Sequence, residues 1–296
     1  MHRRLSQWIK GLICLLTIVF FSHSCDDSSE PKGEQNIPYI EQARKALIME
    51  LIVNDLESIV LNAMINLDLQ DPGGTIDTHI DYNIFSLRGN CAREIDADNN
   101  RLTLKLNSCV DAIDILRAGD MIVAYDDSFD RTGNLISVQL VDYQYENVTI
   151  NGDFTILNTS EVDSEEKKYE ITFPQTSLKF TDSTLDFDFS GTRSMVVREI
   201  EGSIRNPDIE SRVDVDWKIT EQGGEVFKIE DNGYTQYRLD CWADGFYLPR
   251  AGVQEVSGSD FELTIDYYKS GCGHEFAILT NGNTFENLSL EGIFEQ

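Results

Sequence analysis

Basic residues are scarce in this sequence. Lysine and arginine total 24 of 296 residues, against 52 aspartates and glutamates, so the formal net charge is −28 at pH 7. A chain this acidic is poorly suited to neutralise phosphates, so we expect no nucleic acid partner. The sequence also lacks the run of about 20 apolar residues that a transmembrane helix needs. Hydrophobic residues still make up 41% of the chain, which is enough for a packed core and argues against global disorder.

Motifs of familiar enzyme chemistry are missing as well. The sequence has no CxxC spacing, no GxSxG nucleophile elbow and no glycine-rich phosphate loop between a strand and a helix. Of its four histidines, only His79 and His274 follow the expected signal peptide, and neither belongs to a recognisable catalytic triad. A glycosidase needs only two carboxylates, but with 52 acids any pair is uninformative. We therefore expect no cofactor and no enzyme activity.

The first 24 residues have the order of a secretory signal peptide. Basic residues near the start precede the apolar run 11–21 (GLICLLTIVFF), and small residues precede Cys25. This order resembles the lipobox of bacterial lipoproteins, in which the cysteine carries acyl chains such as palmitate. The sequence departs from the pattern at Ser22, where an aliphatic residue is usual. The alternative is an ordinary signal peptide that leaves Cys25 as an odd thiol.

Residues 25–37 predict an acidic, flexible tether. An acidic run directly after the lipidated cysteine resembles the surface-export signal of Bacteroidetes lipoproteins. The resemblance implies an outer-membrane lipoprotein, on the cell surface in preference to the periplasmic face, that contacts the membrane through its lipid. The alternative for the acidic run is a plain solvated linker.

Four cysteines remain after the lipidation site, and an even number in an exported protein predicts disulfides. Four cysteines permit three pairings. A turn at residues 98–100 predicts a hairpin that brings Cys91 opposite Cys109, because each lies nine residues from Asn100. Elimination then leaves Cys241 with Cys272. A zinc site or a nucleophilic thiol finds no support in the cysteine spacing, so no metal is expected there.

Residues 38–72 predict an N-terminal helical segment. The helix covers 38–67 and ends at the Asp-Pro-Gly-Gly of 71–74. Apolar residues extend well beyond one narrow stripe, so the helix must be covered on more than one side. We expect it to pack under the protein's own sheet; a heptad seam with a partner helix is the alternative.

From residue 75 onward the hydrophobic period becomes two. Apolar and polar residues alternate over 102–106, 185–189, 213–217 and 261–267, which is typical of strands with one wet face. Turn signals recur at short intervals and favour antiparallel hairpins, among them Asn151-Gly152, Asp231-Asn232-Gly233 and Asn281-Gly282. The predicted fold is mainly β, an antiparallel meander or sandwich-like sheet over 75–296 with the N-terminal helix packed on it. Halves at 75–201 and 202–296, or one continuous sheet, are both allowed.

A family resemblance lies in the same strands. Residues 265–272 (IDYYKSGC) and 277–282 (AILTNG) are similar to the closing segment of uncharacterised Bacteroidetes lipoproteins, whose pattern runs roughly IDYGxGxCDxxATVTxNG. The chain departs from this pattern at Tyr268 and at Gly273-His274. Because the matching residues are turns, cysteines and strand positions, the resemblance implies fold and location and no activity.

Aromatic side chains gather in the last third of the chain and offer one candidate binding surface. Trp242, Tyr247 and Tyr268 are the candidates for stacking on sugar rings. The favoured alternative is that these aromatics pack in the core or on a disulfide.

Two further motifs are weaker. Asp126, Asp127 and Asp130 form an acidic loop that is a candidate for weak Ca²⁺ binding, although a solvated turn is the favoured interpretation. Ser183 lies in Asp-Ser-Thr, which resembles a short Bacteroidetes O-glycosylation pattern. Taken together, the sequence predicts a non-enzymatic binding or structural lipoprotein with a glycan or an envelope protein as a possible partner. A glycan-binding module and an acid-pair glycan hydrolase are the alternatives.

Overall fold

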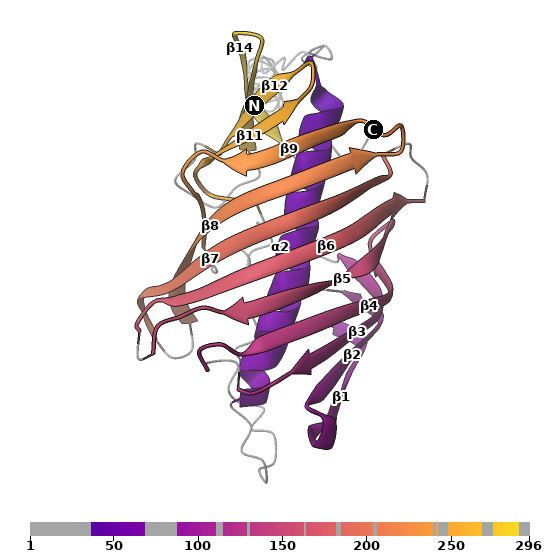
Figure 1. Cartoon of the computed structure of the whole chain (residues 1–296), viewed down its shortest axis with the longest axis vertical. Coiled ribbons are helices and arrows are strands. Elements are labelled where there is room, and N and C mark those ends of the chain that lie inside the picture. Colours follow the sequence, from indigo (N-terminus) through magenta and orange to yellow (C-terminus); the bar gives the residue numbers. More distant parts are fainter. Residues whose placement is uncertain are drawn as a thin grey trace, which may run out of the picture. The chain divides into compact units, whose positions relative to one another are not determined.

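The computed structural model divides the chain into two compact units, Met1–Ile37 and Pro38–Gln296, and the second is described here (Figure 1). The structure describes residues 37–68, 88–110, 115–128, 131–162, 164–181, 185–203, 206–238, 241, 248–267 and 275–289. The expected signal peptide and lipidation site, including Cys25, lie outside these residues.

One α-helix and fourteen strands make up the described part of this unit. The helix is α2 (Ile40–Asp68), and a 3-10 turn, η1, covers Ala97–Asn99. The strands are β1 (Arg88–Asp96), β2 (Arg101–Val110), β3 (Leu116–Tyr125), β4 (Leu135–Tyr145), β5 (Val148–Asn158), β6 (Lys167–Phe180), β7 (Phe187–Ser203), β8 (Asn206–Glu221), β9 (Val226–Asp231), β10 (Thr235–Arg238), β11 (Val253–Gly258), β12 (Glu262–Asp266), β13 (Glu275–Thr280) and β14 (Asn283–Ser289).

All fourteen strands belong to one antiparallel sheet. Their order follows the chain from β1 to β9 and from β11 to β14, with β9 paired to β11, while β10 pairs with β8. The predicted antiparallel meander is therefore confirmed, as a single sheet and not as two stacked ones. Figure 1 shows α2 running across the strands on one face of this sheet. The sheet continues through residues 201–202, because β7 spans that point and pairs with β8.

Alternating side chains explain why these segments form strands. Leu102, Leu104 and Leu106 on β2 are buried, and the polar residues between them are at least partly exposed. β8 repeats the pattern with Val213, Val215 and Trp217 inside and Asp214 and Asp216 outside. Burying one face of each strand removes apolar area from water at about 25 cal/mol per Å², which favours this register over one shifted by a residue.

Aromatic rings form the centre of the core. Phe154 on β5 stacks on Phe173 of β6 with ring centroids 4.7 Å apart. Trp217 on β8 meets Phe173 and Phe189 edge-on, at 5.6 and 5.8 Å. Ring contacts of this kind contribute about 0.5–1.5 kcal/mol each beyond the area they bury. The four rings therefore hold neighbouring strands β5 to β8 together on their inner face.

Two predicted reversals of the chain are wrong. Asn151-Gly152 lies inside β5, and the chain reverses before that strand at Glu146, which adopts a φ of 53°. Asp231-Asn232-Gly233 makes no hairpin, because β9 and β10 run in the same direction and both pair with β8. The turn residues there interrupt the pairing with β8, and the chain then continues in the same direction along β8. In contrast, Asn281-Gly282 joins β13 to β14 as predicted.

The hairpin of the first predicted disulfide has a register different from the expected one. Cys91 pairs with Leu106, and Cys109 pairs with Gly89. The two cysteines lie on adjacent strands, but they are diagonal to each other. The difference arises because the hairpin is centred between Asp96 and Arg101 and not on Asn100.

The helix lies within the core along most of its length. Residues 43–60 are all buried, and they include polar and charged residues as well as apolar ones. The prediction that this helix is covered on more than one side is confirmed. Its first turn is fixed by Tyr39, whose ring stacks on Phe261 at 5.0 Å. No helix in the described part of the chain is both long and apolar enough to cross a membrane.

Candidate functional site

Two arginines occupy inward positions of otherwise apolar strands. Arg117 on β3 and Arg193 on β7 are each 0% exposed. On β7, Arg193 is in phase with the buried Phe187, Phe189 and Met195, so its side chain lies on the inner face of the sheet that covers α2. A guanidinium buried in this way is costly unless a carboxylate accompanies it. The helix supplies these carboxylates.

The first group, the Arg117 cluster, consists of Asp55, Arg117 and Tyr143. The Arg117 Nε atom donates to the Asp55 Oδ1 atom at 2.9 Å, and the second nitrogen of the guanidinium donates to the same oxygen. Tyr143 on β4 donates its hydroxyl to Asp55 Oδ2 at 2.8 Å. Burial, followed by the Asp55 charge, raises the pKa of Tyr143 well above its usual value. The phenol therefore stays protonated, and one cation balances one anion in this cluster.

The second group, the Arg193 cluster, is larger and joins α2 to four strands and the segment after β12. From the helix it contains Glu50, Asn54 and Glu57, and from the sheet it contains Arg193, Asp231, Thr235, Tyr237, Gln254 and Tyr267. The Arg193 Nη1 atom donates to Glu50 Oε1 at 2.7 Å, and Nη2 donates to Asn54 Oδ1 at 2.5 Å. Glu50 also accepts hydrogen bonds from Tyr237 and, at 3.2 Å, from Gln254. Nearly every donor around Glu50 thus comes from the sheet.

Two carboxyl groups of this cluster hold their protons unusually tightly. Desolvation raises the pKa of Glu57 from 4.5 to about 8, with the Arg193 charge opposing the shift and the Glu50 charge adding to it. Desolvation, followed by the Glu50 charge, raises the pKa of Asp231 from 3.8 to about 7. Burial is the main cause of both shifts, and the ratio of three carboxyl groups to one guanidinium adds to it.

Shifted pKa values often mark catalytic groups, but their setting here favours a structural role. Glu50, Asn54, Glu57 and Arg193 are at most 1% exposed, so a substrate has no access to them without movement of α2. Buried ion pairs add little net stability, but breaking one is expensive, and they select the arrangement that satisfies them. A helix that is apolar all round packs in many rotations. The two arginines accept only the rotation and the position that bring Asp55 and Glu50 to them.

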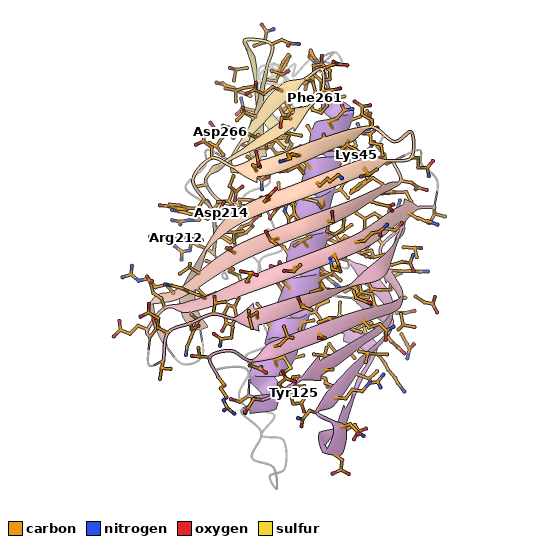
Figure 2. All side chains as sticks on the ribbon, viewed as in Figure 1. Lys45, Tyr125, Arg212, Asp214, Phe261 and Asp266 are labelled. Atoms are coloured by element: carbon orange, nitrogen blue, oxygen red, sulfur yellow. The ribbon has the colours of Figure 1, made fainter. Side chains whose placement is uncertain are left out.

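An open cleft lies on the other side of the sheet, where β8, β9 and β11 meet. Its lining carries five carboxylates, those of Asp214, Asp216, Glu230, Asp231 and Glu255. Among the residues that the structure describes, no group of three or more acidic, histidine or cysteine side chains is arranged to hold a metal. Next to this cleft, Tyr234 is 44% exposed, and the Arg212 guanidinium lies 5.2 Å from its ring centroid. Figure 2 shows Arg212 and Asp214 together at this flank of β8.

Most of the binding candidates named from the sequence fall outside the described part of the chain. This applies to Trp242, Tyr247, Tyr268 and Ser183, and also to Asp130 of the acidic loop. Two other aromatics of the last third, Tyr237 and Tyr267, are 1% exposed and belong to the core.

The described part of the acidic loop forms a local turn. Asp127 accepts a hydrogen bond from the Ser128 backbone at 2.8 Å and pairs with Arg131. The Asn134 side chain in turn accepts one from the Asp127 backbone at 2.9 Å. These contacts use the Asp127 carboxylate within the turn itself. Binding of Ca²⁺ at this loop stays a prediction.

The predicted disulfides also stay predictions. Cys109 and Cys241 are buried, at 0% and 3% exposure. Cys272 lies outside the described residues, and Cys91 is described only by its place on β1.

Sequence reasoning missed the two buried clusters, although signals for them exist. Arg117 is in phase with the buried Met121 and Val123, just as Arg193 is in phase with Phe189. On the helix, Glu50, Asn54 and Glu57 follow the i, i+4, i+7 spacing of one face. Inward arginines on strands, read together with acids on an apolar helix, would have indicated their pairing.

The comparisons with known proteins leave the assignment open. No protein-family model matches the chain, and no curated protein or solved structure matches it. Its function is therefore argued from its own residues.

Proposed function

We propose that this chain is an exported, lipid-anchored protein with a non-enzymatic role in binding or envelope structure. Cys25 carries the lipid, and residues 26–37 link it to the folded unit that begins at Pro38. We propose the outer membrane as its location, with the cell surface favoured over the periplasmic face.

The observation that supports a non-enzymatic role is the buried position of Glu57, the carboxyl group with the larger pKa shift. Glu57 and its neighbours in the Arg193 cluster are enclosed between α2 and the sheet, and their hydrogen bonds serve to hold the helix. The exposed side of the same strands is polar. On β8 it carries Arg212, Asp214, Asp216 and Lys218. A solvated, charged sheet face suits contact with a partner or a polar ligand better than it suits acid–base chemistry.

The proposed cellular location and the lipid anchor are tested on the protein expressed in a bacterium that processes lipoproteins. Mass spectrometry of the N-terminal peptide is expected to show acyl chains on Cys25, and the Cys25→Ser variant is expected to be released from the membrane. Protease added to intact cells is expected to digest residues 38–296 without lysis. An unmodified N-terminus would remove the lipid anchor, and protection until lysis would move the protein to the periplasmic face.

A glycan-binding role is the second candidate, and Tyr234 supports it. An exposed ring beside a cleft with carboxylates and the Asn232 amide offers both stacking and hydrogen bonding to hydroxyl groups. Retention on immobilised polysaccharides is expected to fall for Tyr234→Ala and to stay unchanged for Tyr125→Ala, a strand-end tyrosine elsewhere on the sheet. Release of reducing ends from the same polysaccharides would instead support hydrolysis. Equal retention by both variants would contradict this candidate.

A further inference from the structure

The Arg193 cluster has more carboxyl groups than cations. Glu50 and Glu57 on α2 and Asp231 at the end of β9 all act on the single guanidinium of Arg193 or on one another. The Arg117 cluster differs, because its described members contain one carboxylate, that of Asp55, paired with Arg117. Full ionisation would leave the Arg193 cluster with a net negative charge inside the core, which is costly.

Glu57 is the carboxyl group that the cluster leaves without donors. It is 1% exposed, and neither of its oxygens has a hydrogen-bond partner within the described structure. Its Oε2 atom lies 3.2 Å from Arg193 Nε, but the two terminal nitrogens of that guanidinium donate to Glu50 and Asn54. A carboxylate in this position has only the nearby Nε of Arg193, with no hydrogen bond formed, in place of its hydration in water, whereas a neutral carboxylic acid requires far less solvation.

A chain of polar residues connects Glu50, the neighbour of Glu57 in this cluster, with solvent. Asp231 lines the open cleft and pairs with Gln254 of β11, which donates to Glu50 at 3.2 Å. Thr235 donates to Asp231 at 3.3 Å from the start of β10. The break between β9 and β10 places Asp231 at the cleft and the buried Thr235 directly behind it. A proton therefore has a polar route between the cleft and the Arg193 cluster.

The described groups that face Glu57 and its neighbours come from α2, β7, β9, β10, β11 and the residue after β12. The acids are Glu50 and Asp231, and the base is Arg193. Tyr237 and Tyr267 are hydroxyl donors whose pKa values are raised well above the usual value, first by burial and then by the Glu50 charge. Asn54, Thr235 and Gln254 complete the described set and do not titrate.

We propose that the Arg193 cluster is a pH-sensitive lock between α2 and the sheet, closed while Glu57 is a neutral acid and weakened when Glu57 loses its proton to solvent. The proton leaves by way of the cleft at Asp231. The resulting second carboxylate on α2 then shares the single guanidinium of Arg193 with Glu50 and has no hydrogen bond of its own. The helix opens from the sheet more often, which exposes the inner face. The direction of the shifted pKa of Glu57 agrees with this geometry.

The test compares wild type with Glu57→Gln, and uses Glu41→Gln as the matched control. Glu41 lies in the first turn of the same helix with a half-exposed side chain. Amide hydrogen exchange is measured between pH 5 and 9 and corrected for intrinsic exchange. In wild type and Glu41→Gln, the ionisation of Glu57 is expected to raise the opening constant of α2 by up to tenfold per pH unit until about pH 8. In Glu57→Gln this contribution from Glu57 is expected to be absent. The same pH dependence in all three proteins would overturn the proposal.

A second measurement uses the wild-type protein alone, in case Glu57→Gln does not fold. Infrared spectra in D₂O at pH 6.5 are expected to show the carbonyl stretch of protonated carboxylic acids, to which Asp231 and Glu57 both contribute, and which disappears above about pH 8. A side-chain carboxyl ¹³C titration assigned to Glu57 separates the two groups. Ionisation of Glu57 near its ordinary value would overturn the proposal whatever the variant does.

Discussion

Arg117 on β3 and Asp55 on α2 are 62 positions apart in the chain, and their side chains meet inside the core with Nε 2.9 Å from Oδ1. Neither side chain is more than 3% exposed. Charges at this depth are stable only as a pair. The contact therefore ties the N-terminal helix to a strand in the first part of the sheet, and Arg193 does the same for a later strand.

Arg193→Lys is expected to destabilise the protein although it keeps the charge. A lysine ammonium cannot reproduce the planar fork that donates to both Glu50 and Asn54. We expect a loss of about 2 kcal/mol in the free energy of unfolding, measured by urea denaturation. Arg212→Lys is the control, because Arg212 is exposed on the same sheet. Equal stability of the two variants would show that the planar guanidinium of Arg193 contributes no more to stability than a lysine ammonium does.

Gly191→Ala is expected to destabilise the sheet between β7 and β8. A Cβ atom at this position would lie 2.1 Å from the Asp216 carbonyl oxygen and 2.8 Å from the Trp217 ring, at a φ of +150°. Backbone must move to relieve this clash, so a loss of about 3 kcal/mol is expected. Gly223→Ala, in the β8–β9 turn, meets nothing within 4 Å and serves as the control. Similar thermal midpoints for both variants would contradict the close packing of Gly191 on Trp217.

The stability of the folded unit is expected to fall as pH rises from mildly acidic to neutral values. The pKa of Glu57 is raised from 4.5 to about 8, and that of Asp231 from 3.8 to about 7. The folded state therefore binds these protons more tightly than the unfolded state. Their stabilisation is complete below about pH 4 and is lost progressively up to about pH 8. Each proton contributes a slope of about −1.4 kcal/mol per pH unit within its own window. Urea denaturation at several pH values measures this slope, and stability rising with pH between 5 and 7 would contradict the account.

The cysteine pairing is tested on the exported protein with Cys25 replaced by serine. Thiol titration in denaturant without reductant is expected to find no reactive thiol, and reduction is expected to release four. Peptide mapping is expected to link Cys91 with Cys109 and Cys241 with Cys272. Cys91 and Cys109 lie diagonally on adjacent strands and not directly opposite each other. A peptide map that links either of them to Cys241 or Cys272 would contradict the predicted pairing.

The sheet was predictable from local patterns, and its exceptions have local causes. Alternation over 213–217 identified β8 because burying Trp217 and its neighbours depends on side-chain order along one strand. Asn151-Gly152 looks like a turn because those residue types favour turns, but its neighbours on β6 pair with it and keep it within β5. The same Asn-Gly dipeptide can occur in a strand or in a turn, so the pairing with a neighbouring strand decides which of the two forms.

The buried clusters were harder to predict because their partners are far apart in sequence. Glu50 is separated from Arg193 by 143 positions and from Gln254 by 204. An acid on a helix usually lies at the surface, and nothing near Glu50 in the chain says otherwise. The pairing becomes evident only when the inward phase of Arg193 on β7 is considered together with the all-round burial of α2.

The central claim is that buried ion pairs hold α2 to the sheet, and a double-mutant cycle on Asp55 and Arg117 tests it most directly. Urea denaturation is measured for wild type, Asp55→Leu, Arg117→Met and the double variant. Each single change leaves a buried partner unpaired and is expected to cost about 3–5 kcal/mol. The double variant is expected to lose much less than the sum, because no unpaired charge remains. Additive losses would show that Asp55 and Arg117 contribute independently, and would contradict the account.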